Sequence, residues 1–212
     1  MTIDSKKLSV VDDYTRLNEY LLLISPDDRL RSRLVSRKKE FTATYGNDDA
    51  ERSLPHLTLA NFILSDSNQD KIIKPLKDVA SRSNKIGIEL ENFKWFKEHT
   101  IYVDVKYKTD MKQLVRKITN AIKRFIKADN NYPPHFILNP HLTLCKGLTS
   151  EQYKKSLLEY GALKFSDKFT AAEMILLKRS VIATERYREV GRFRLGGPES
   201  NNRTIQLSLF NF

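Results

Sequence analysis

The sequence has a single cysteine, Cys145, among its 212 residues. No disulfide can therefore form within the chain, which favours a reducing compartment. No apolar run approaches the ~20 residues that a membrane-spanning helix needs. The first residues, MTIDSKKLSVVDDYTRLNEY, also lack the apolar segment of a signal peptide. We therefore expect a cytoplasmic protein with no membrane partner.

Metal-binding motifs are missing as well. The four histidines include no His-x-x-x-His pair, and neither a cysteine pair nor a paired-carboxylate motif lies beside them. Because no set of ligands is visible, we expect no metal and no other cofactor.

Acidic residues are too few to balance the basic ones. The chain has 37 Lys and Arg against 26 Asp and Glu, which gives a formal net charge of +11. Such a surplus attracts phosphate-rich partners over long range, although a soluble basic protein with no such partner has the same composition. Hydrophobic residues make up 40% of the chain, which is enough for a folded core, and we expect one domain over residues 1–212.

Alternation and helical spacing of apolar residues predict an α+β fold. One helix is expected to start at Ser25 and Pro26, and another at a capping box of Thr149 and Gln152. The remaining helices are predicted over 70–83 and 111–126. Strands are predicted at 20–24, 56–64, 86–91, 100–107, 141–146, 169–178, 187–195 and 204–210.

One pentapeptide occurs twice, as Pro55–Leu59 and as Pro140–Leu144. Each copy follows a predicted strand and helix and precedes another helix and strand, so the chain reads as two copies of one α/β unit. We place the approximate lobes at 18–98 and 99–180. Closing strands are expected over 187–210.

Strand geometry puts the polar residues of each pentapeptide on one face, because residues two apart point to the same side. His56 shares a face with Thr58, and His141 shares a face with Thr143. The leucines between them would anchor the opposite faces in a core. If the two copies pack about a twofold axis, the two His-x-Thr faces meet across one groove.

Such a groove suits the cleavage of a phosphate ester. A neutral imidazole can take a proton from the attacking oxygen, and a charged imidazole can give one to the leaving oxygen, since the pKa of histidine is ~6.5. Threonine hydroxyls can donate to the non-bridging phosphoryl oxygens. A lone histidine in a strand is more often structural, but the repeated context favours His56 and His141 as a catalytic pair. The sequence leaves open which of them is the acid.

The other candidates rest on weaker signals. By alternation Cys145 shares the face of His141, where a free structural thiol is more common than a nucleophile. His99 and His135 are expected in exposed loops. Hairpin or core packing is expected for Trp95 and Phe96, which lie between two predicted strands and could otherwise stack a base.

A tyrosine near the end of the chain is a possible substrate contact. Tyr187 lies between Arg186 and Arg188, a combination that could stack a base and hold phosphates.

The paired motifs, their spacing and the order of elements over about 20–195 resemble the 2H phosphoesterase superfamily. Within it the chain is most similar to the bacterial RNA 2′,3′-cyclic phosphodiesterase and 2′-5′ RNA ligase branch. The resemblance implies a bilobal fold in which two antiparallel-rich sheets line a central groove, with helices outside. It also implies that His56 and His141 are catalytic, that Thr58 and Thr143 bind phosphate oxygens, and that Lys146 contacts the substrate.

The placement of Lys146 depends on the local strand geometry. Simple alternation puts it on the core side, so a substrate contact requires the strand to end or bulge there.

The function that the resemblance implies is a metal-independent phosphodiesterase for 2′,3′-cyclic phosphate or related 2′-5′ or cyclic (oligo)nucleotide phosphodiesters. Ligation of 2′-5′ RNA by the reverse transesterification and a catalytically silent RNA-binding module are the alternatives. The partners would be RNA ends or a nucleotide-derived phosphodiester. The sequence does not separate RNA, nucleotide, second-messenger and ADP-ribose substrates.

Overall fold

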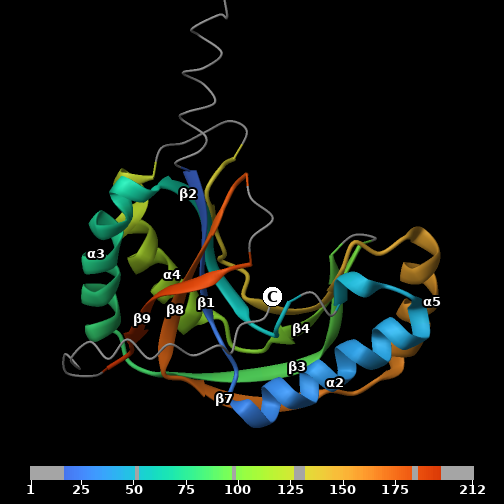
Figure 1. Cartoon of the computed structure of the whole chain (residues 1–212). Helices are drawn as coiled ribbons and strands as arrows, with labels where there is room; N and C mark the ends of the chain where they lie inside the picture. Colours follow the sequence, from blue (N-terminus) through green and yellow to red (C-terminus); the bar gives the residue numbers. More distant parts are fainter. Residues whose placement is uncertain (1–16, 51–52, 97–98, 127–131, 183–185, 197–212) are drawn as a thin grey trace, which may run out of the picture.

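The computed structural model describes residues 17–50, 53–96, 99–126, 132–182 and 186–196 (Figure 1). Four α-helices lie in these ranges, namely α2 (Asp28–Tyr45), α3 (Gln69–Ser81), α4 (Thr109–Ile122) and α5 (Ser150–Ala162). The described strands are β1 (Leu17–Ile24), β2 (Leu57–Ser65), β3 (Ile86–Phe96), β4 (Thr100–Val105), β5 (His135–Phe136), β6 (His141–Lys146), β7 (Ser166–Ala171), β8 (Glu173–Ser180) and β9 (Arg188–Arg194). This composition confirms the α+β class.

All paired strands are antiparallel and form one sheet in the order β7-β3-β4-β6-β2-β1-β8-β9, with β5 paired to β2. The order is symmetrical about the junction of β6 and β2. β3 lies in the first sequence copy but pairs with β4 of the second, and β8 of the second copy pairs with β1 of the first. The boundary near residue 98 therefore divides the repeat in the sequence, whereas each half of the sheet contains strands from both copies.

The two halves of the sheet meet at a single backbone pair, Leu57 with Leu142. We expected two separate sheets, and they are joined here into one continuous sheet. Each half curves away from the junction, with α3 and α4 beside the β1, β2, β8 and β9 half and α2 and α5 beside the other (Figure 1). The helices lie on the outside, as expected.

Helix ends follow their capping residues. Asp27 caps α2 by accepting from the Leu30 backbone N–H, so the helix begins after Asp27 and not at the expected Ser25 and Pro26. At its other end Gly46 adopts a φ of 67°, a left-handed conformation that suits glycine. The capping box of Thr149 and Gln152 opens α5 as predicted.

The main core lies between the helices and one face of the sheet. The apolar stripe of α4 is buried there as its spacing predicts, and it contains Met111, Leu114, Val115, Ile118 and Ile122. On the other half, Tyr160 of α5 packs edge-on against Phe41 of α2 and Phe93 of β3, with ring centroids 5.5 and 4.9 Å apart. These aromatic contacts hold α2 and α5 on the sheet.

The predicted strand over 169–178 is wrong as one strand. The chain breaks at Ala172, so that β7 pairs with β3 and β8 pairs with β1. No glycine, proline or other turn signal separates the two strands, so the sequence gives no sign that the pairing partner changes. Trp95 and Phe96 belong to β3 and not to a connection between strands. The strand predicted over 204–210 lies outside the described residues. Nowhere in the described ranges is a helix long and apolar enough to cross a membrane.

Candidate active site

The two His-x-Thr motifs meet at the junction of the sheet halves. Continuing the register of Leu57 and Leu142 by one residue each way places His56 opposite Thr143, and Thr58 opposite His141. Opposed residues of an antiparallel pair point to the same side, so the structure brings all four side chains together on one face. The leucines of both motifs are fully buried on the other face, and the four polar residues are partly accessible.

The two histidines are oriented by equivalent hydrogen bonds. His56 Nδ1 lies 2.8 Å from the Leu54 carbonyl oxygen, and His141 Nδ1 lies 2.9 Å from the Asn139 carbonyl oxygen. A carbonyl oxygen only accepts, so each Nδ1 carries the hydrogen. In a neutral ring Nε2 then holds the lone pair, and it is the atom that can exchange a proton.

The electrostatic surroundings of the two imidazoles differ. The pKa of His56 is lowered to about 4, mainly by burial and also by the positive charges of Lys38 and Lys146 and by His141, against the raising effect of the Leu54 hydrogen bond. Burial also lowers the pKa of His141, but there Asp104 acts in the opposite direction. His56 is thus the imidazole that more readily stays neutral.

Asp104 lies beside His141 because the two residues are paired between β4 and β6. Its carboxylate is held by Lys94 of β3 and by Lys108, whose ammonium nitrogen lies 2.7 Å away. These cations keep the pKa of Asp104 below its usual value despite burial. The negative charge next to His141 is therefore permanent near neutral pH.

Aromatic rings surround His141 on the groove side. Phe96 and Tyr102 stack on each other with centroids 4.3 Å apart, and each meets the His141 ring edge-on, at 4.7 and 5.3 Å. Trp95 points the other way and packs against the main core. Trp95 therefore has the packing role that was expected, whereas Phe96 borders the site.

Both motifs contain a β-bulge at the same position. In β2 the register moves from Leu22–Ala60 to Leu23–Thr58, which leaves Leu59 as the extra residue. In β6 it moves from Ile101–Cys145 to Tyr102–Thr143, which leaves Leu144 extra. An extra residue reverses the alternation of every side chain that follows it.

The second bulge corrects two expectations based on simple alternation. Cys145 lies in the main core, only 1% exposed, and not on the groove face. Lys146 is exposed instead of facing the core. Its charge acts on His56, so the bulge places it close to the first motif.

The Tyr187 region is arranged differently from what its sequence indicated. Tyr187 is half-buried against a small apolar cluster on the groove side, and the Arg179 guanidinium lies 4.5 Å from its ring centroid. The cluster consists of Leu21, Leu23, Ile175 and Leu177. Leu23 pairs with Thr58, so the cluster adjoins the site.

The arginines on either side of Tyr187 are exposed. Arg188 pairs with Lys178, whose ammonium group binds Asp66 and Gln69 on the opposite side of the sheet from the motifs. The structure therefore does not bring Arg188 to the site, and Arg186 makes no contact that joins it to the motif residues in the described ranges.

Four residues lie near the site although the sequence did not predict that they would. Asp104 and Tyr102 alternate in one strand, but their closeness to His141 and Thr143 depends on a pairing partner that no local pattern shows. His135 is exposed, as expected, yet it lies in β5 opposite Asn61 of β2. Lys38 had a readable signal, since it lies one helical turn after Leu34 on the apolar stripe of α2.

The remaining histidine, His99, is exposed as expected, and its Nδ1 lies 2.8 Å from the Thr100 hydroxyl oxygen. Among the residues that the structure describes, no three His, Cys, Asp or Glu side chains form a cluster that could hold a metal ion.

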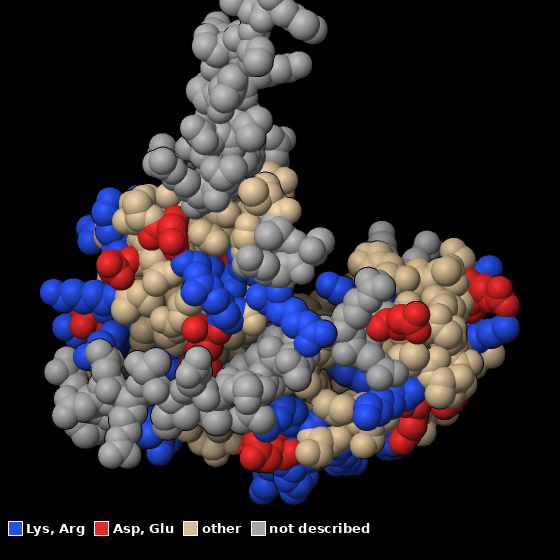
Figure 2. All heavy atoms as spheres, viewed as in Figure 1, with Lys and Arg blue, Asp and Glu red and all other residues tan. Residues whose placement is uncertain are grey.

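The molecular surface is hollowed between the two halves of the sheet (Figure 2). Lys and Arg side chains border this groove on both sides in that view. An anionic ligand entering the groove is therefore attracted toward the motif residues.

A family described as the 2′-5′ RNA ligase superfamily matches residues 26–182. The fold is similar to E. coli LigT in apo form (TM-score 0.59, 14% identity, 86% of this chain and 99% of that one) and to E. coli LigT with 3′-AMP (0.58, 15%, 85% and 99%). It is also similar to TT0787 of Thermus thermophilus (0.58, 12%, 85% and 100%). No curated protein sequence matches the chain.

Proposed function

Because the chain belongs to the 2′-5′ RNA ligase superfamily, we propose that it is a metal-independent phosphodiesterase that opens 2′,3′-cyclic phosphates of nucleotides or RNA ends. The observation that carries this proposal is the meeting of two His-x-Thr motifs at one backbone pair, with both imidazoles fixed in the same tautomer. E. coli LigT structures with 3′-AMP, NADP+ and ATP support a nucleotide-derived substrate.

His56 is the general base in this proposal and His141 the general acid. Neutral His56 takes a proton from water through Nε2 as the water oxygen attacks phosphorus. Protonated His141 gives the proton on its Nε2 to the ribose oxygen that leaves, so one proton is taken up and one is released. The assignment rests on the lower pKa of His56 and on Asp104, which favours the cation at His141.

Two hydroxyl groups and one lysine are placed to stabilise the negative charge that develops on the phosphoryl oxygens. The hydroxyl groups of Thr58 and Thr143 lie on the same face as the histidines and can donate to the non-bridging oxygens. Lys146 supplies a positive charge beside them. The bound phosphodiester is itself an anion and favours the protonated form of His141.

The test is a panel of 2′,3′-cyclic nucleotides, cyclic-ended RNA and 2′-5′ oligonucleotides, with identification of the products. His56→Ala and His141→Ala are each expected to lower kcat by ~10²–10⁴-fold while the fold stays cooperative. His99→Ala, an exposed histidine outside the site, is the matched control. Phosphorus NMR should show a 2′-phosphate product. Near wild-type kcat in either motif variant contradicts the paired mechanism.

Ligation is the second candidate, because the same two imidazoles can serve a 5′-hydroxyl group in place of water. Incubation of cyclic-ended RNA with a 5′-hydroxyl RNA should then give a 2′-5′ linkage that depends on both histidines. A silent RNA-binding module would instead bind such ends without turnover in any of these assays.

A further inference from the structure

The apolar stripe of α2 contains one lysine. Leu30, Leu34 and Phe41 are fully buried, and Lys38, which lies on the same side of the helix, is only 3% exposed. A lysine at such a position normally extends its ammonium group to solvent. Here the whole side chain is enclosed, so its charge acts inside the protein.

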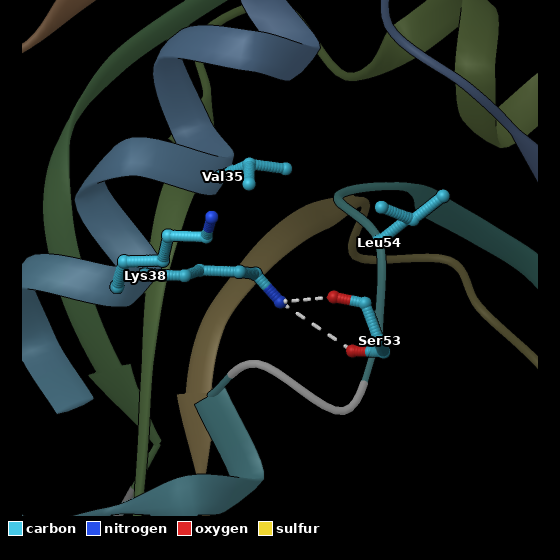
Figure 3. Close-up of a pocket in the computed structure, with 5 residues that line it drawn as sticks. Val35, Lys38, Ser53 and Leu54 are labelled. Carbon is cyan, nitrogen blue, oxygen red and sulfur yellow. Dashed lines mark hydrogen bonds between the residues drawn. The ribbon is translucent and has the colours of Figure 1, made fainter. Parts of the chain in front are cut away.

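The ammonium group of Lys38 binds the chain just before the first motif. Its Nζ donates to the Ser53 carbonyl oxygen at 2.8 Å and approaches the Ser53 hydroxyl oxygen at 3.4 Å (Figure 3). Among the described side chains, no carboxylate forms an ion pair with it. Burial lowers the pKa of Lys38 to about 8. A buried cation without a counter-charge opposes folding, so stability does not explain this residue.

A short covalent path joins this contact to the base. Ser53 precedes Leu54, and the Leu54 carbonyl oxygen receives the hydrogen bond from His56 Nδ1. Lys38 thus fixes the peptide next to the carbonyl group that sets the orientation and tautomer of His56.

The second motif has a corresponding lysine, Lys108, whose ammonium nitrogen donates to the Asn139 side-chain oxygen at 2.9 Å. Lys108 also forms an ion pair with Asp104, so its charge beside His141 is offset, whereas the charge of Lys38 is not offset by a described carboxylate.

We propose that Lys38 is a positioning residue for His56: its buried ammonium group fixes the Ser53 backbone, and its charge adds to burial in disfavouring the imidazolium form. This inference rests on the proposed role of His56 as the base. It assigns part of the difference between the two histidines to α2, an element outside both motifs.

The charged groups that act on His56 come from two elements. Lys38 lies on α2, and Lys146 and His141 lie on β6, and each of the three disfavours the imidazolium form. Removing the charge of Lys38 leaves the other two in place. The pKa of His56 should then rise by roughly 0.5–1 unit, and the acidic limb of kcat/KM should move upward by the same amount.

Three variants separate the charge from the hydrogen bond. Lys38→Gln keeps a donor for the Ser53 carbonyl but removes the charge, whereas Lys38→Met removes both. Lys38→Arg keeps both, and a cavity of about 60 Å³ lined by Lys38, Ser53 and Leu54 leaves room for the larger group (Figure 3). Lys39→Met, an exposed neighbour on the same helix, is the matched control.

The measurement is an NMR titration of the His56 ring in the full chain, together with kcat/KM against pH on a cyclic nucleotide. We expect the titration to shift in Lys38→Gln and Lys38→Met but not in Lys38→Arg or Lys39→Met. In Lys38→Met, kcat should also be ~10-fold lower than in Lys38→Gln, because the imidazole ring is less well oriented without the hydrogen bond to Ser53.

An unchanged His56 titration in folded Lys38→Met or Lys38→Gln overturns the proposal. If Lys38→Met does not fold, the Gln and Arg variants still decide it. The titration needs no substrate, so a failure of the proposed function, seen as no turnover of any cyclic phosphate by the wild-type chain, is distinguished from a failure of this inference.

Discussion

At the scale of single residues, the site depends on which face of a strand each side chain occupies. Alternation predicted the common face of His56 with Thr58 and of His141 with Thr143, because two-residue periodicity holds within the first three motif residues. It misplaced Cys145 and Lys146, because the extra residue at Leu144 reverses the alternation. A bulge is set by the pairing of two strands, and one strand's sequence does not contain that information.

Lys146 provides the prediction at this scale. Lys146→Ala should raise KM for a cyclic nucleotide by about 10-fold with a smaller change in kcat, since a charge that attracts the phosphodiester is lost. Steady-state kinetics at one ionic strength measure both constants. Cys145→Ala is the adjacent control, because this buried side chain should affect stability by about 1 kcal/mol and leave KM unchanged. If Cys145→Ala raised KM and Lys146→Ala did not, the side chains of β6 would follow simple alternation without the bulge.

At the scale of elements, the order of helices and strands was predictable and their partners were not. The stripe of α4 and the cap of α5 are local patterns, so the sequence contains them in full. The division of the strand predicted over 169–178 into β7 and β8 depends on two distant strands, β3 and β1. For the same reason no pattern placed α2 on the half of the sheet that carries the second motif.

Asp167 tests how α2 is attached. Arg29 and Arg33 of α2 both bind this carboxylate of β7 at 2.6 Å, and the hydrogen bond from Arg29 is the main cause that lowers its pKa to about 2. A carboxylate with a lowered folded-state pKa stabilises the fold above its ordinary pKa of 3.8, and that contribution is lost as the pH falls toward 2.

Urea unfolding at several pH values should therefore show Asp167→Asn less stable than wild type near neutrality, with the difference vanishing near pH ~2. Asp28→Asn is the control, since Asp28 is a highly exposed partner of Arg31. A difference that persists unchanged at the acidic end would assign the loss to packing and not to charge.

At the scale of the whole molecule, the sequence showed that a unit is repeated but not how the strands of the two copies are combined in the sheet. Two identical pentapeptides predicted two copies, and the junction at Leu57 and Leu142 is where a twofold arrangement would bring them together. The exchange of β3 and β8 between the halves depends on pairing with strands that are distant in the sequence, which no local pattern shows.

The net charge of +11 acts at this scale too. If the natural substrate is RNA, KM should rise roughly 10-fold between about 50 and 200 mM salt while kcat stays constant, as expected for two or three released counterions. A 2′,3′-cyclic mononucleotide is the matched substrate and should respond much less. Equal salt sensitivity of both substrates would indicate that only the reacting phosphate is bound.

The strand exchange also determines the order in which the fold can be completed during synthesis. Asn18 in β1 finds its partner in Ser180 of β8, near the end of the described chain. While the polypeptide is still being made, the first copy has β3 without β4 and β1 without β8. Long-range pairing of this kind slows folding and leaves strand edges open to other chains. A nascent chain that has only the first copy would therefore expose an incomplete sheet, and a chaperone that covers its open edges would act at that stage.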